Sequence, residues 1–157
     1  MSRSYGTGEL RQQPTKHPDI AQKLNDQGFA VVHDVLTKQQ IKNYSQALDA
    51  VYEKQQAEFG REALDEIGEL NIARMPFLYD QQFLQLLKND LVQDVVAHQL
   101  GANYILSLQN GIISHPNEIH HQSAWHRDLP YQDYSTSKPV AINAFFCLDE
   151  FLPNNLI

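Results

Sequence analysis

The clearest hydrophobic pattern in the chain begins at Thr37 and runs up to Gly60. Thr37 is followed three residues later by Gln40, which is a capping-box pattern for the start of a helix. Apolar side chains then recur every three or four residues, as on one face of a helix; they are Ile41, Tyr44, Leu48, Val51 and Tyr52. The sequence therefore predicts a long helix here with one buried face.

A shorter helix is predicted near the start of the chain. Pro18 and Asp19 suit the first turn of a helix that runs through Leu24, and Gly28 can end it in a left-handed conformation. The apolar run 29–32 that follows predicts a strand.

Two further helices are predicted in the middle of the chain. Asp80 and Asp90 are each placed as N-caps before apolar, helix-spaced residues, and Gly101 suits the end of the second helix. Residues 61–80 lack a clear period and are interpreted as a surface loop.

The pattern changes after residue 103. Residues 104–109 and the run "VAINAFFCL" at 140–148 are rich in aliphatic and aromatic side chains, which favour strands. Helices thus dominate the first hundred residues and strands the remainder. This order predicts the α+β class rather than alternating strands and helices.

Composition limits the kind of protein. With 157 residues and 42% hydrophobic content, the chain suits one globular domain, with residues 1–17 as a flexible polar lead and 18–157 as the folded part. A net charge of −7 argues against nucleic acid and anionic membranes as partners. Cys147 alone cannot form an internal disulfide, and no run suits a signal peptide or a bilayer span. A cytoplasmic location is expected.

The richest chemistry lies in "HHQSAWHRD", residues 120–128. Side chains two residues apart on a strand project from one side, so His126 and Asp128 can converge on one ion. Imidazole nitrogen with carboxylate oxygen suits Fe(II), although such a pair taken alone is usually a surface ion pair. His120 and His121 are adjacent and face opposite ways, so at most one could join the site.

Three stretches of the chain resemble the phytanoyl-CoA dioxygenase family of Fe(II)- and 2-oxoglutarate-dependent oxygenases. "LNDQGFAVVHDVLTKQQI" is similar to the family's opening, "WHRD" followed by "LPYQ" to its iron-binding motif, and "AFFCLDEFLPNN" to a later strand and turn. The resemblance implies a double-stranded β-helix, or jelly roll, behind N-terminal helices. It also implies that His126 and Asp128 are catalytic and are two of the three Fe(II) ligands.

The resemblance suggests where 2-oxoglutarate binds. Gln109 and Asn110, at the end of the predicted strand before the motif, are candidates to hydrogen-bond this co-substrate, or they cap a turn before Gly111. Asn143 is a polar residue in an apolar strand, and a buried amide needs partners. It either faces the active-site cavity or satisfies a neighbouring strand end.

Two residues of the family pattern are absent from this chain. No histidine and no arginine follows Asp128, so neither the distal iron ligand nor the arginine that grips 2-oxoglutarate can be assigned. We expect a jelly roll truncated before its last strands, with unpaired edges that allow oligomers. A fragment of a longer protein is the favoured explanation; strands supplied by another chain and a truncated relative without catalysis are the others.

The leading hypothesis is an enzyme that hydroxylates a small molecule with O2 and 2-oxoglutarate. The alternative is a non-catalytic interaction protein whose exposed strand edge recruits a partner strand. A metal protein of cupin type with another reaction is a third hypothesis.

Overall fold

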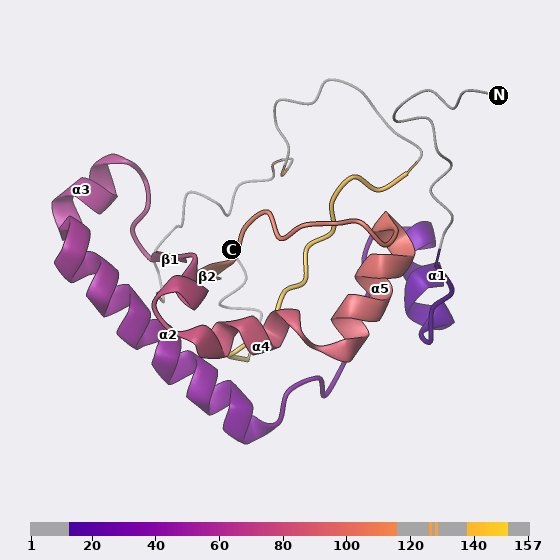
Figure 1. The fold of residues 1–157 in the computed structure, drawn as a ribbon. Helices are drawn as coiled ribbons and strands as arrows, with labels where there is room; N and C mark the ends of the chain where they lie inside the picture. Colours follow the sequence, from indigo (N-terminus) through magenta and orange to yellow (C-terminus); the bar gives the residue numbers. More distant parts are fainter. Residues whose placement is uncertain (1–12, 116–125, 127, 129–137, 151–157) are drawn as a thin grey trace. The chain divides into compact units, whose positions relative to one another are not determined.

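The computed structural model describes residues 13–115, 126, 128 and 138–150 (Figure 1). The chain divides into two compact units. The α1–α5 unit, named for helices α1 (Pro18–Gln27) and α5 (Asp90–Leu100), takes in Met1–His33, Leu87–Leu106 and Thr136–Ala144. The sheet unit takes in Asp34–Leu86, Ser107–Ser135 and Phe145–Ile157. The class is α+β, as the sequence predicts.

The sheet unit is built on helix α2 (Lys38–Phe59). The predicted capping box is present, because Thr37 Oγ1 accepts a hydrogen bond from the Gln40 backbone and the Gln40 side chain accepts one from the Thr37 backbone. The predicted apolar face is buried at Tyr44, Leu48, Val51 and Tyr52. The prediction for this helix is confirmed, because capping and periodicity are both local to the sequence.

Strands β1 (Ile72–Arg74) and β2 (Asn110–Ile112) pair antiparallel and are the two strands of the described residues. Figure 1 shows the pair beside α2. In the register, Ile72 pairs with Ile112, Ala73 with Gly111 and Arg74 with Asn110. Ala73 is fully buried in the α2 core with Tyr44, Leu48, Val51, Tyr52 and Phe83.

The prediction of a surface loop over residues 61–80 is wrong. Helix α3 (Arg61–Glu66), strand β1 and the 3-10 helix η1 (Pro76–Leu78) all lie in this range. They are short, and a three-residue strand leaves no readable period. The 3-10 helix η2 (Gln81–Phe83) and helix α4 (Leu84–Leu87) follow. The Phe83 ring lies 5.8 Å from the Tyr44 ring, centroid to centroid, which ties this segment to α2.

The α1–α5 unit contains helices α1 (Pro18–Gln27) and α5 (Asp90–Leu100). Gly28 ends α1 in the left-handed conformation and Gly101 follows α5, both as predicted. The N-cap of α5 is Asn89 rather than Asp90, because its side chain accepts hydrogen bonds from the backbone of Leu91 and Val92. In the segment before α1, Thr15 and Lys16 both donate to the Asp94 carboxylate.

Three predicted strands are absent from the described residues. Residues 29–32, 104–109 and 140–148 have no regular secondary structure; the strand that pairs, β2, begins at Asn110. Several of their apolar side chains are exposed, including Phe29, Ile105, Leu108 and Phe145. Strands of this kind become stable in sheets of three or more strands or against a helix, and the described residues supply a two-stranded sheet.

Two further features of the described residues are the state of the cysteine and the length of the helices. Cys147 is a free, exposed thiol. Within the part of the chain that the structure describes, no helix is both long and apolar enough to cross a bilayer.

The acid sensitivity of the sheet unit is expected to depend on Asp80. Its carboxylate accepts hydrogen bonds from the Gln82 backbone (2.9 Å) and side chain (2.6 Å), which hold the pKa of Asp80 below its usual value. The stabilisation is present above the ordinary Asp pKa of about 3.9 and is lost as pH falls through the lower folded pKa. Asparagine also caps helices but does not titrate.

Asp80→Asn should therefore lose stability relative to wild type at pH 7, and that difference should shrink between about pH 4 and pH 2. Urea unfolding across this range measures it, with Asp49→Asn on the exposed side of α2 as the control for one lost charge. A wild-type advantage that stays constant from pH 7 to pH 2 would contradict the assignment.

Candidate metal centre

His126 and Asp128 come together in the structure. His126 Nε2 lies 3.3 Å from Asp128 Oδ1, and the two side chains are 53% and 60% exposed. His126 lies in a segment without regular structure and Asp128 in a bend. Although neither residue lies in the strand that the prediction assumed, one imidazole nitrogen and one carboxylate oxygen lie within reach of a single ion, on an accessible surface.

The donor set fits Fe(II) in kind but is incomplete. Nitrogen from histidine and oxygen from a carboxylate are two of the three ligands in a facial iron site. Among residues 13–115, 126, 128 and 138–150, no group of three or more His, Cys, Asp or Glu side chains could hold a metal. His120 and His121, and Trp125 beside the motif, lie outside the described residues.

Gln109 and Asn110 lie where β2 begins, so the alternative that they cap a turn does not describe them. The Gln109 carbonyl accepts a hydrogen bond from Met75 N (2.8 Å), and its Nε2 donates to Phe83 O (3.1 Å). With the Asn110 amide in its better-satisfied orientation, its nitrogen donates to Gln109 O (3.0 Å) and its oxygen accepts from Arg74 Nη1 (2.7 Å). The side-chain amides of Gln109 and Asn110 are therefore both held by hydrogen bonds within the sheet unit.

The Gln109 amide has one unused group. Its Oε1 is buried and has no hydrogen-bond partner among the described atoms. An amide oxygen only accepts, and ionised 2-oxoglutarate offers only acceptors. A hydrogen bond from Gln109 to the co-substrate therefore has to come from the second N–H of its Nε2, and Asn110 likewise has a second N–H with which to donate.

Arg74 is a polar neighbour that the sequence reasoning missed. Its guanidinium donates to both carboxylate oxygens of Glu69, and this hydrogen bonding raises the pKa of Arg74. Glu69 therefore already neutralises the charge beside Asn110. The signal available in the sequence was weak, because an arginine in a segment interpreted as a loop suggests only a solvated side chain.

Gln55 was also missed, although its position carries a signal. It lies seven residues after Leu48 and four after Val51, on the buried face of α2, and it is 4% exposed. Its amide bonds to both backbone groups of Arg74. A glutamine in register with a helix's apolar face is a reason to look for a buried polar contact.

Asn143 is exposed, which differs from the expectation of a buried strand amide. Residues 140–148 form no strand among the described residues, so no sheet covers this side chain. Asn143 belongs to the α1–α5 unit, whereas His126 and Asp128 belong to the sheet unit. Its role at the site stays a prediction.

Comparison with known proteins agrees with the motifs. The family model for phytanoyl-CoA dioxygenase (PhyH) matches residues 24–155. Two uncharacterized proteins, Mb1539 of Mycobacterium bovis and Rv1501 of Mycobacterium tuberculosis, are each 32% identical to the chain over 144 residues. The match covers 87% of this chain and 51% of each relative, so the chain spans about half their length.

No solved structure matches the chain with significance. The family assignment therefore depends on sequence, and the family model alone covers well over half of the chain, including the His126 and Asp128 motif. This chain belongs to the phytanoyl-CoA dioxygenase (PhyH) family.

Proposed function

We propose that this protein is an Fe(II)- and 2-oxoglutarate-dependent dioxygenase that hydroxylates a small molecule. The observation that carries the proposal is the 3.3 Å approach of His126 Nε2 to Asp128 Oδ1 in a chain of this family. The overall reaction balances as substrate C–H plus O2 plus 2-oxoglutarate giving substrate C–OH, succinate and CO2. When bound, iron would supply the activation of oxygen, and 2-oxoglutarate would supply two electrons.

The chain's own residues have positioning roles in this proposal. His126 and Asp128 would hold the metal, and the exposure of both side chains leaves room for exchangeable ligands. Asn110 would donate its second N–H to 2-oxoglutarate, fixed by Arg74 on one side and the Gln109 carbonyl on the other. Gln109 and Asn143 are further co-substrate candidates. A group held on two sides loses little entropy when it binds a ligand.

We further propose that residues 18–157 are the N-terminal portion of a jelly-roll oxygenase domain in the cytoplasm. The relatives' length supports this, because the match covers 51% of them. Exposed apolar side chains of the sheet unit, Leu108, Ile112 and Phe145, also support it, since further strands would cover such residues. Unpaired edges would otherwise allow self-association.

Metal binding by the 157-residue chain tests the pair directly. We expect weak Fe(II) binding in anaerobic calorimetry, because two protein ligands leave the ion largely hydrated. His126→Ala and Asp128→Ala should each lower the affinity for Fe(II) by more than about tenfold. Loss of a residue that only hydrogen-bonds to a metal ligand already costs about that much, and these two residues would bind the metal themselves.

The control is His33→Ala, which removes an exposed histidine from the α1–α5 unit. It should leave Fe(II) affinity unchanged. Equal affinity in wild type, His126→Ala and Asp128→Ala would remove the metal assignment and leave the pair as a surface contact.

A further inference from the structure

The outer edge of β1 is closed by a side chain. In an antiparallel pair, hydrogen-bonded and non-hydrogen-bonded residue pairs alternate. Met75 N donates to Gln109 O, so the next pair, Arg74 with Asn110, is non-hydrogen-bonded. The backbone N–H and C=O of Arg74 therefore point away from β2, where an edge strand would leave them unpaired.

Gln55 satisfies both of these groups. Arg74 N donates to Gln55 Oε1 (3.0 Å), and Gln55 Nε2 donates to Arg74 O (2.6 Å). The primary amide thus presents the same acceptor and donor as the peptide group of a neighbouring strand. Gln55 is 4% exposed, so water does not readily replace it.

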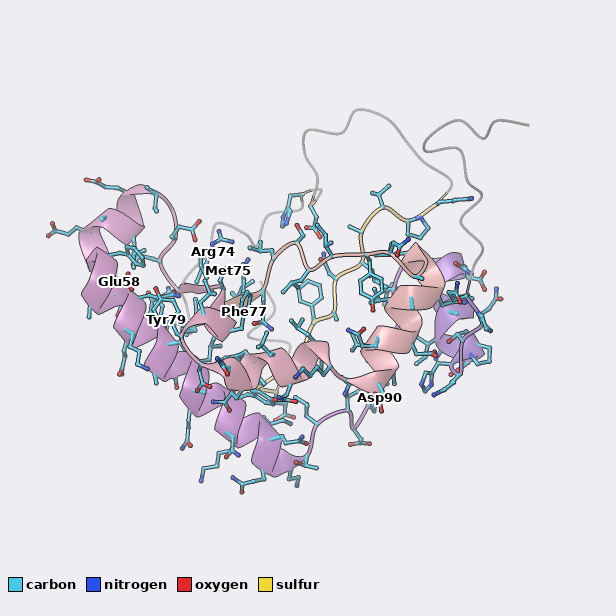
Figure 2. The ribbon with its side chains drawn as sticks, in the orientation of Figure 1. Glu58, Arg74, Met75, Phe77, Tyr79 and Asp90 are labelled. Carbon is cyan, nitrogen blue, oxygen red and sulfur yellow. The ribbon has the colours of Figure 1, made fainter. Side chains whose placement is uncertain are left out.

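The segment that Gln55 holds is conformationally costly. Asn71 (φ 63°) and Met75 (φ 47°) flank β1 in the left-handed region, and Met75 also precedes Pro76, which restricts it further. Such residues cost about 1–3 kcal/mol each and persist only where their surroundings determine them. At the first bend, the Tyr52 hydroxyl accepts a hydrogen bond from Asn71 N (2.8 Å). Figure 2 shows Arg74 and Met75 next to each other at the second bend, where β1 ends.

The same strand sets the place of Asn110. The side chains of a non-hydrogen-bonded pair lie close together on one face, and Arg74 Nη1 donates to the Asn110 amide oxygen (2.7 Å). Glu69 fixes the other side of the guanidinium. A contact chain therefore runs from Gln55 on α2, through Arg74 on β1, to Asn110 on β2.

We propose that Gln55 is a positioning residue: its side-chain amide acts as a third strand beside β1 and, through Arg74, fixes the Asn110 amide for its ligand. The first part concerns the sheet alone. The second part rests on the proposed function, because it takes that ligand to be 2-oxoglutarate.

Hydrogen exchange followed by NMR tests the first part without iron or co-substrate. In Gln55→Leu the protection factor of the Arg74 amide should fall by at least about tenfold, the size expected for one lost buried partner. The Met75 and Ile113 ladder amides should lose protection too, while amides in the middle of α2 keep theirs. Gln46→Leu makes the same substitution at an exposed position of α2 and should leave the protection of all these amides unchanged.

Gln55→Glu gives a second, pH-dependent arm. The ionised carboxylate can accept from Arg74 N but cannot donate to Arg74 O, whereas the protonated carboxyl can do both. Repulsion between the buried carboxylate and Arg74 O should open the edge of β1 at neutral pH, so protection of Arg74, corrected for the intrinsic exchange rate, should be low there and recover as pH falls. A residue that only fills space would not show this recovery. Unchanged Arg74 protection in Gln55→Leu, or no acid recovery in Gln55→Glu, would overturn the proposal.

The second part is measured in a longer form of the protein that turns over 2-oxoglutarate. Gln55→Leu should raise the KM for 2-oxoglutarate several-fold with a smaller change in kcat, and Gln46→Leu should change neither. A lowered kcat with unchanged KM would overturn this part alone. Absence of any turnover in the wild-type longer form would count against the proposed function, while the exchange measurements would still decide the role of Gln55 in the sheet.

Discussion

Gly111→Ala is expected to lower the free energy of unfolding by about 2 kcal/mol, within the range for overpacked cores. A Cβ at Gly111 would lie 2.1 Å from Leu48 Cδ1 and 2.8 Å from Cδ2. Leu48 is buried in the core cluster, so its side chain would have to shift within a packed core to make room. The close approach of β2 to α2 thus requires glycine at this position, and urea unfolding measures the effect.

A double-mutant cycle separates this clash from a backbone effect. Leu48→Ala alone should cost about 2–5 kcal/mol through the cavity that it leaves. Gly111→Ala added to Leu48→Ala should cost much less than it does alone, because the clashing atoms are gone. Additive costs would mean that Gly111 does not limit how closely β2 packs on α2.

The sequence predicts the helices well because their signals are local. The Thr37 capping box, the spaced apolar face of α2 and the left-handed Gly28 are each determined within a few residues. The N-cap of α5 was misplaced by one residue, since Asn89 and Asp90 are both suitable side chains. Where two neighbouring residues suit an N-cap equally well, only the hydrogen bonds in the structure show which of them caps the helix.

The sheet was harder to predict because its determinants are distant in sequence. β1 is three residues long, and its edge is closed by Gln55, nineteen residues earlier. β2 begins at Asn110, directly after the run 104–109 that the sequence predicts as a strand. Pairing across 38 residues, as between Ala73 and Gly111, leaves no local pattern.

The approach of His126 to Asp128 was predictable, whereas their role as metal ligands stays a prediction. The two-residue spacing of His126 and Asp128 predicts their convergence, and their atoms approach to 3.3 Å. Neither the third iron ligand nor the polar set of Gln55, Glu69 and Arg74 follows from that spacing. These residues come from segments whose patterns indicated only a helix face and a loop.

His126→Ala is expected to abolish turnover in a longer form of the protein that supplies a second histidine and an arginine. Loss of a protein ligand to the metal should remove about 4 kcal/mol of transition-state stabilisation, which is on the order of a thousandfold in rate. Asp128→Ala should have a similar effect, and His33→Ala, at an exposed histidine in the other unit, should have none. The rate of 2-oxoglutarate consumption measures all three. Activity within tenfold of wild type in His126→Ala would remove it from the metal site.

The most direct test is succinate formation with Fe(II), ascorbate and 2-oxoglutarate, compared between the 157-residue chain and the longer form. We predict that the longer form produces succinate in step with 2-oxoglutarate consumption and that the 157-residue chain produces none above background. Robust turnover by the 157-residue chain would show that His126 and Asp128 do not need the further ligands. An inactive longer form would contradict the oxygenase assignment itself.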